Sequence, residues 1–386
     1  MTTGLYGANG GNGRRVILAA VQTTEGTAET LDPATDYKAY LTCAVKPARE
    51  VYERRIVSPE QHGYPSENID ERVDLEVVAE IVPQTIGPAD DTDRPFPHEM
   101  LVSSGWNLTS EVASKTHTYV LTSDQEGLLT LGEYLINAQN TATRLTELYN
   151  ARGDFELSTT DEGSLQYRWT GMGLNSTPTA PRTIDLNPWA DALNNLPGAT
   201  LRPLQRKGQT VRIYDQAGTT LYGGGSLASP GTAGALLSWS LKGQRNPVAR
   251  KTVSATSGIQ GVMLNPGGAS LEMVLEVNDI DLATWCVANK MIQVRITIPQ
   301  PSLSDNTATL VCWGQIVDLD DTQITDGRYV AAVTLQCVYP PDLPGNSPQA
   351  GQQPLQDWTT TTNQGVPVIP VAGLPKGLVA LQFKTA

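Results

Sequence analysis

Val73-Asp74-Leu75-Glu76-Val77-Val78-Ala79-Glu80-Ile81-Val82 is the stretch of sequence that decides the fold. Its apolar residues at alternate positions share one face of an extended chain, whereas Asp74, Glu76 and Glu80 lie on the other face. A period of two is typical of a strand with one buried and one solvated face. We therefore expect a mainly β protein.

A similar pattern returns in the second half of the chain. The first copy runs from Lys46-Pro47-Ala48-Arg49 to Leu75-Glu76-Val77, and the second from Asn246-Pro247-Val248-Ala249-Arg250 to Leu275-Glu276-Val277. Repetition at this spacing indicates two copies of one β module rather than a short-period solenoid. A short helix is expected after each copy, at residues 98–106 and 279–288.

Composition divides the chain into five parts. Residues 1–15 are rich in Gly and Asn and predict an N-terminal arm. The first module is expected at 16–175, a Pro/Thr/Asn-rich linker at 176–208 and the second module at 209–340. Residues 341–386 predict an extended Pro/Gly/Thr-rich C-terminal arm. Because this arm ends in apolar segments, it either docks on a neighbouring molecule or lies back on its own domain.

Charge and cysteine content exclude several classes of protein. The formal net charge of −13 disfavours ordinary nucleic-acid binding, because an acidic surface repels phosphates. It suits either simple solubility or a conduit through which DNA slides. The four cysteines, Cys43, Cys286, Cys312 and Cys337, form no CxxC pair, so we expect free thiols rather than a zinc site. Lacking a recognisable signal peptide or membrane span, the protein is expected to be made in the cytoplasm.

No catalytic or metal-binding pattern stands out. His62, His98 and His117 are scattered, and we expect them on the surface or in loops. The glycine-rich segment 7–13 lacks the Lys-Ser/Thr of a phosphate-binding loop. The acidic run 318–321 lacks the spacing of a calcium loop. The sequence therefore predicts no enzyme, no metal and no cofactor.

Several segments together resemble one viral family. They are Ala19–Thr27 with its Glu-x-Gly-Thr turn, Pro47–Pro59, Gly105-Trp106 with Thr118–Val120, the hairpin of Arg152–Leu157 and Leu165–Gly171, and Ser238–Leu241 continuing to Tyr339. Over residues 16–340 the chain resembles the major tail tube proteins of phages with long, non-contractile (siphovirus-like) tails. The resemblance implies two tandem tail-tube-like β-sandwich or barrel modules, each with a short α-helix, plus extended N- and C-terminal arms.

The resemblance also implies a function. It is that of a structural virion protein, a tail tube subunit that forms trimeric, pseudo-hexameric rings stacked into a channel for genome delivery. The implied partners are further copies of the chain, the tape measure protein and other tail proteins. DNA passes through the lumen without specific binding, and no membrane is involved. The implied location is the tail of the virion.

The charged strand faces predict which residues line such a channel, although a solvated outer face is the alternative. The lumen-lining candidates are Asp74, Glu76, Glu80, Asp154, Glu156, Glu272 and Glu276. Two long loops, at residues 54–68 and 250–268, are expected to make contacts between rings. The candidates in these loops are Arg54, Arg55, His62, Tyr64, Arg250, Lys251 and Met263.

Two other functions remain open from the sequence. A terminator, hub or other baseplate ring would share the fold but would not stack indefinitely. A carbohydrate-binding adhesin built from paired β-sandwiches would carry clustered, exposed Trp and Tyr side chains.

Overall fold

The structure is a computed structural model. The described residues are 14–32, 36–38, 40–52, 67–82, 94, 97–111, 116–121, 127–136, 142–159, 163–175, 183–184, 204, 207–215, 220–223, 234–252, 254–255, 258–276, 286–289, 291–299, 307–325, 328–338 and 379–384. The fold is mainly β, as the alternating sequence predicts, and its strand pairings are antiparallel. Among these residues, no helix is long and apolar enough to cross a membrane.

Strands account for nearly all of the regular structure in the first half of the chain. Its elements are β1 (Arg14–Gln22), β2 (Tyr37–Lys38), β3 (Thr42–Tyr52), β4 (Glu67–Glu80), α1 (His98–Ser103), β5 (Trp106–Glu111), β6 (Thr116–Leu121), β7 (Leu128–Ile136), β8 (Ala142–Thr159), β9 (Leu165–Asn175) and β10 (Thr183–Ile184). Most of the expected N-terminal arm and linker lies outside the described residues, although β10 falls in the linker and pairs with β8.

The second half continues in the same way. Its strands are β11 (Thr210–Asp215), β12 (Thr220–Tyr222), β13 (Leu236–Gly243), β14 (Pro247–Lys251), β15 (Ile259–Leu264), β16 (Ala269–Glu276), β17 (Met291–Pro299), β18 (Thr307–Thr325), β19 (Arg328–Cys337) and β20 (Val379–Lys384). Three of them correct the sequence-based expectation. The loop expected at 250–268 is largely the hairpin of β14 and β15, and the expected C-terminal arm contains strand β20.

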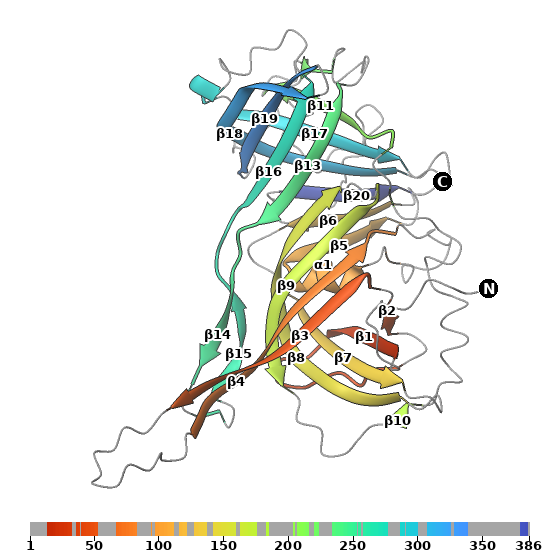
Figure 1. Ribbon diagram of the computed structural model, residues 1–386, viewed down its shortest axis with the longest axis vertical. Coiled ribbons are helices and arrows are strands. Elements are labelled where there is room, and N and C mark those ends of the chain that lie inside the picture. The colour runs from red at the N-terminus through yellow and green to blue at the C-terminus, as the bar shows by residue number, and fades with distance from the viewer. Residues whose placement is uncertain are drawn as a thin grey trace, which may run out of the picture.

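One layer of the fold runs through both halves of the chain without a break, and we call it the shared sheet. The pairings give the order β3–β4–β9–β8–β13–β16–β19–β18. The first quartet is β3, β4, β9 and β8, and the second quartet is β13, β16, β19 and β18. The quartets meet where β8 pairs with β13, and Figure 1 shows these strands descending side by side from one half into the other.

A second layer covers the apolar face of the shared sheet. Its order is β12–β11–β17–β18–β20–β6–β5, so the first part of β18 lies in this layer and the last part in the shared sheet. In Figure 1, β20 and β6 run across the view while β9, β13 and β16 run steeply, an arrangement typical of orthogonally packed sheets.

Strand β8 also changes neighbours along its length. Its final residues pair with β9 and its first residues with β7, which in turn pairs with β1. The change occurs at a register shift beside Asn150, whose φ of 51° lies in the left-handed region. The side chain of Gln22 fixes this kink, since its Oε1 accepts from the Asn150 backbone N–H at 2.7 Å. A bulge of this kind bends a strand out of its sheet.

Strand β20 closes the second layer between the two halves. It pairs with β18 on one side and β6 on the other, and Val379, Leu381 and Phe383 are fully buried. Gln382 is also buried and donates to Thr118 Oγ1 at 3.1 Å. The end of the C-terminal segment is thus a central strand of the chain's own fold. Of the two placements that the sequence left open, these residues take the one on their own domain.

Helix α1 matches the short helix expected at 98–106, but it is shorter. Gly105, with φ of 87°, ends the turn after the helix, and Trp106 begins β5 instead of extending the helix. Most of the second expected helix lies outside the described residues. Of residues 286–288, which the structure describes, Cys286 and Val287 are helical.

The core confirms the alternation read from the sequence. Val73, Leu75 and Val77 are buried, as are Leu271 and Met273 on the equivalent strand of the second quartet. A single hydrophobic cluster contains residues of both quartets and of the second layer, including Trp106, Trp169, Trp239 and Phe383. Because this cluster does not divide at the β8–β13 joint, the two halves bury their apolar surface together.

Candidate functional site: the polar face of the shared sheet

The face of the shared sheet away from the core is polar across the joint between the quartets. Six of the seven acidic candidates lie on it half-exposed, in alternation with buried residues on β4, β8 and β16. These are Asp74, Glu76, Glu80, Glu156, Glu272 and Glu276. Asp318 and Asp320 on β18 continue the acidic face and are exposed. Their alternation with Leu319 is the signal in the sequence that could have added them to the acidic candidates.

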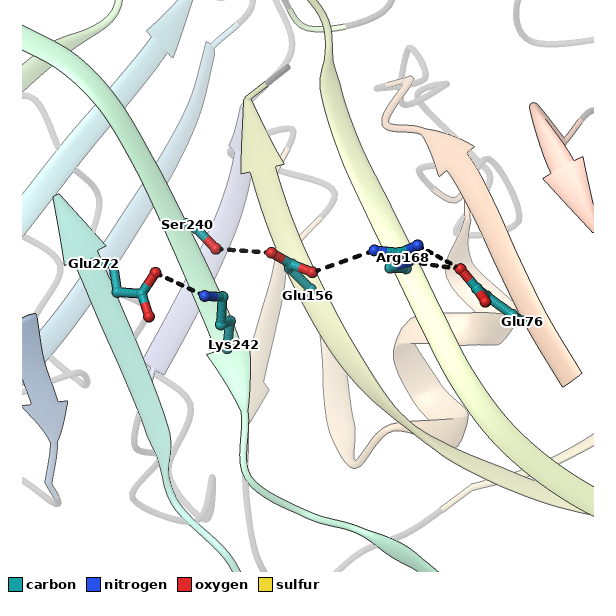
Figure 2. A network of polar contacts seen from close by, with 6 residues as sticks. All are labelled: Glu76, Glu156, Arg168, Ser240, Lys242 and Glu272. Atoms are coloured by element: carbon teal, nitrogen blue, oxygen red, sulfur yellow. Dashed lines mark hydrogen bonds and ion pairs between the residues drawn. The ribbon is translucent and has the colours of Figure 1, made fainter. Parts of the chain in front are cut away.

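Charged side chains form a band across five neighbouring strands (Figure 2). Arg168 on β9 pairs with Glu76 on β4, with 2.6 Å between Nη2 and Oε1, and its Nη1 lies 4.0 Å from Glu156 Oε2 on β8. Ser240 on β13 donates to Glu156 Oε1 at 3.1 Å. Lys242, also on β13, pairs with Glu272 on β16 at 2.7 Å. The Glu156–Ser240 hydrogen bond carries the band across the joint.

The cations in this band make the polar face less acidic than the sequence suggested. Lys242 and Arg72 each lie against one of the predicted carboxylates, and Arg168 lies against two. Since all of these side chains are partly exposed, each pair contributes only about 0–1 kcal/mol. The sequence pattern could have placed Arg168 on the polar face. Arg168 lies between Tyr167 and Trp169, so in a strand its side chain points away from the face that those two residues bury.

Asp154 differs from the other six acidic candidates because it is turned into the joint. Its Oδ2 accepts from the backbone N–H of Arg245 at 2.9 Å, and its Oδ1 accepts from that of Phe155 at 2.9 Å. Burial raises the pKa of Asp154, and these two hydrogen bonds oppose that rise. Gly243 is required here, since a Cβ at that position would collide with the Asp154 carboxylate. Asp154 therefore fixes the turn after β13 onto β8.

The two quartets carry the same kinds of side chain in matching rows. Glu76 lies between Ala44 on β3 and Thr170 on β9, and Thr170 faces Asp154. The corresponding row of the second quartet consists of Ser240, Glu272, Thr334 and Asp318. The next row contains Val78, Arg168 and Glu156 in the first quartet, and Val274, Ala332 and Asp320 in the second.

These rows correct the alignment of the sequence repeat. Pro47 faces Val73 within the first quartet, whereas Pro247 faces Leu264 in the β14–β15 hairpin. Glu76 consequently matches Glu272, not Glu276. The sequence copies belong to related hairpins but are displaced along them, because equal spacing in sequence does not fix the pairing register.

The loop candidates are divided between described and undescribed residues. Arg54, Arg55, His62 and Tyr64 lie outside the described residues. Arg250 and Lys251 are exposed on β14, and Met263 on β15 is 44% exposed, opposite Val248 at 40%. The β14–β15 hairpin, which we call the second arm, crosses strands of the first quartet. It is held there by Arg152, whose Nη1 donates to the Val262 carbonyl at 2.5 Å.

The histidines are placed differently from the sequence-based expectation. His98 and His117 are buried, and His98 Nδ1 lies 2.9 Å from the Tyr119 hydroxyl. His62 is outside the described residues. In the described part of the chain, no cluster of three or more His, Cys, Asp or Glu side chains could hold a metal ion.

All four cysteines are free thiols, as expected. Cys312 and Cys337 are both buried, and a hydrogen bond between them, together with burial, raises the pKa of Cys312 well above its ordinary value. A buried thiol of this kind acts as a small apolar side chain rather than a nucleophile.

No family model and no curated protein matches the chain.

Proposed function

We propose that this protein is a structural subunit of a phage tail tube, which assembles into stacked rings around a channel for DNA. The observation that carries the proposal is the edge-to-edge pairing of β8 with β13, which makes one continuous sheet from two similar quartets. The matching rows support a tandem duplication of one tail-tube-like module. A chain that already joins two such modules edge to edge offers the same two edges to further copies.

The chemistry of the sheet supports a channel lining. The second layer and the core cover its apolar face, so the polar face is the surface left for a lumen. Its carboxylates outnumber its cations, as expected for a wall that DNA must pass without binding. The ion pairs on the polar face reduce the electrostatic repulsion between the acidic faces of the subunits in a ring.

Exposed sheet edges explain why assembly would be favourable. In a monomer, unpaired backbone groups at an edge promote association with other chains. Closure of the sheet into a ring removes those edges. Three copies would supply six quartets, which is the pseudo-hexameric arrangement that the duplication favours.

Negative-stain electron microscopy with sedimentation velocity over a range of protein concentrations tests this function. We expect rings with an axial pore, followed by hollow filaments, as the concentration rises. Rings that never stack would favour a terminator or baseplate component. A monomer without a pore under every assembly condition would contradict the proposal.

A further inference from the structure

The joint between the quartets has a defined register. Lys242 on β13 faces Glu156 on β8, and Leu241 and Ser240 face Leu157 and Ser158. The pairing is antiparallel, and it places a cation opposite a carboxylate on the polar face. This joint is therefore a template for how an edge like that of β8 accepts an edge like that of β13.

Each side of this joint has a counterpart at an outer edge of the shared sheet. Lys46 on β3 corresponds to Lys242 on β13. Lys46 lies two residues after Ala44, which faces Glu76. Lys242 lies two residues after Ser240, which faces the matching Glu272. On the other side, Asp320 on β18 corresponds to Glu156. In the second quartet, Asp320 faces Ala332, and Ala332 faces Val274. In the first quartet, Glu156 occupies the same place in its row, since it faces Arg168, and Arg168 faces Val78.

Both counterparts lie on strands that end the sheet. Within the described residues, β3 pairs with β4 alone, and the part of β18 beyond Gln315 pairs with β19 alone. Lys46 and Asp320 are both exposed, and Val317, on the same strand as Asp320, is 58% exposed. The side chains that point inward, Val45 and Leu319, pack against the core. The two edges thus present the same polar-out, apolar-in alternation as β13 and β8.

The arms supply a second, independent correspondence. The second arm continues from β13 and β16 and lies over β8 and β9, the strands on the far side of the joint. The first quartet has a corresponding hairpin, which we call the first arm. In it, residues 48–52 of β3 pair with residues 67–72 of β4, beyond the end of the β4–β9 pairing. No described strand of the same chain pairs with β3 on the side that corresponds to the joint.

From these correspondences we infer that β18 of one copy pairs antiparallel with β3 of a second copy, with Asp320 opposite Lys46. The first arm of the second copy then lies over β18 and β19 of the first copy, as the second arm lies over β8 and β9. This contact deepens the proposed function, since it names the surface through which one subunit binds the next, and it repeats the internal joint between molecules.

Disulfide trapping between two single variants of the full-length chain tests the register. Lys46→Cys and Asp320→Cys proteins are mixed under assembly conditions, oxidised and separated on a non-reducing gel. We expect a cross-linked dimer only in the mixture, because the Cα atoms of directly opposed antiparallel residues lie about 4.5–5.5 Å apart, within the Cα–Cα range of a disulfide. The unsubstituted protein, with its four native cysteines, gives the background.

Matched controls separate this register from a general contact. Asp318→Cys mixed with Lys46→Cys shifts the partner by two residues and should cross-link much less. A charge swap gives a second measurement at exposed positions. Lys46→Glu should weaken association roughly fivefold per contact by opposing like charges, and Lys46→Glu mixed with Asp320→Lys should restore it.

The outcomes for the pairing and for the proposed function are distinguishable. A cross-linked Lys46→Cys/Asp320→Cys dimer supports the pairing, even if the oligomers never stack into tubes. Rings or tubes that form without this cross-link contradict the β18–β3 pairing but not the proposed tube function. A protein that neither assembles nor cross-links contradicts both.

Discussion

At the scale of single residues, Asp154 shows that the position of a side chain in an alternating strand does not reveal its hydrogen-bond partners. Its place in an alternating strand made it a candidate for a channel wall. In the structure its carboxylate instead holds the backbone of Phe155 and of Arg245 at the joint between the quartets. Both hydrogen bonds join a charged acceptor to backbone donors, a class that contributes more to stability than neutral pairs.

We predict that Asp154→Ala lowers the free energy of unfolding by about 1–3 kcal/mol, because it leaves two backbone N–H groups without their acceptor. Asp154→Asn keeps one carbonyl oxygen and should lose less. Urea denaturation followed by tryptophan fluorescence measures both variants. An alanine variant as stable as the unsubstituted protein would show that water replaces the carboxylate and that Asp154 does not secure the joint.

A second prediction concerns alkaline pH. The Tyr222 hydroxyl lies 2.8 Å from the Ala235 carbonyl and 2.9 Å from that of Glu276, and burial raises the pKa of Tyr222 to about 12. Because this folded-state pKa is above that of an unfolded tyrosine, about 10, the stabilisation is complete below pH 10 and is lost as the pH rises towards 12.

Tyr222→Phe should therefore be less stable than the unsubstituted protein at pH 8, and the difference should shrink between pH 10 and about 12. Denaturation midpoints across that range check the prediction, with the other tyrosines contributing equally to both proteins. A stability difference that stays constant through the range would mean that the phenol does not titrate in its folded environment.

Alternation alone was sufficient to place most single residues on a face, but not to find their partners. It put Glu76 and Glu272 on the polar side, and both lie there. Arg168 reaches Glu76 from a strand 92 residues away along the chain. Such contacts depend on pairing register, which the spacing within one strand does not contain. The contacts of Asp154 could not be predicted for the same reason, since its carboxylate accepts from the backbone N–H of Arg245, which lies just after β13 in the other half of the chain.

At the scale of elements, strand β20 is the clearest case of a segment that sequence patterns hide. Residues Val379–Phe383 are buried on both faces, so they lack the alternation that marks a half-buried strand. The long β8 and β18 were foreseen only in part, because β8 changes its partner from β7 to β9 and β18 passes from the second layer into the shared sheet. By contrast, β4, β9 and β16 have one solvated face and could be predicted closely.

We predict that Phe383→Ala lowers the free energy of unfolding by about 3–5 kcal/mol, since it empties a fully buried aromatic site. The ring of Phe383 packs edge-on against Tyr119 at 5.9 Å, so the loss involves both halves of the chain. Phe383→Leu retains most of the apolar volume and should lose less. Calorimetric unfolding measures both variants, and equal stability of the alanine variant would show that β20 does not close the second layer in solution.

At the scale of the whole molecule, two quartets joined by β8 and β13 and bridged behind by β20 share one hydrophobic cluster. The sequence repeat indicated a duplication, but the rows of paired residues match Glu76 with Glu272, not with Glu276 as the repeat suggested. The mainly β character was therefore accessible from the sequence, whereas the joint was not. The joint exists only after strands distant along the chain have paired.

The charge of the proposed channel wall gives a further prediction. Replacing Glu76 or Glu276 by Lys should slow the ejection of DNA from virions that carry the variant, because a cation on the wall attracts passing phosphates. Glu25→Lys makes the same charge change at an exposed turn position and serves as the control. Ejection followed by DNA-dye fluorescence gives the rates. Equal rates for all three variants would argue against a lumen at the polar face.

The most direct measurement is a helical reconstruction by electron cryomicroscopy of filaments assembled from the purified protein. We predict a hollow tube whose inner wall is the polar face of the shared sheet, with Glu76 and Glu272 in equivalent positions around the channel. A tube with that face on its outer surface, or a protein that remains a pore-free monomer, would contradict the proposed function.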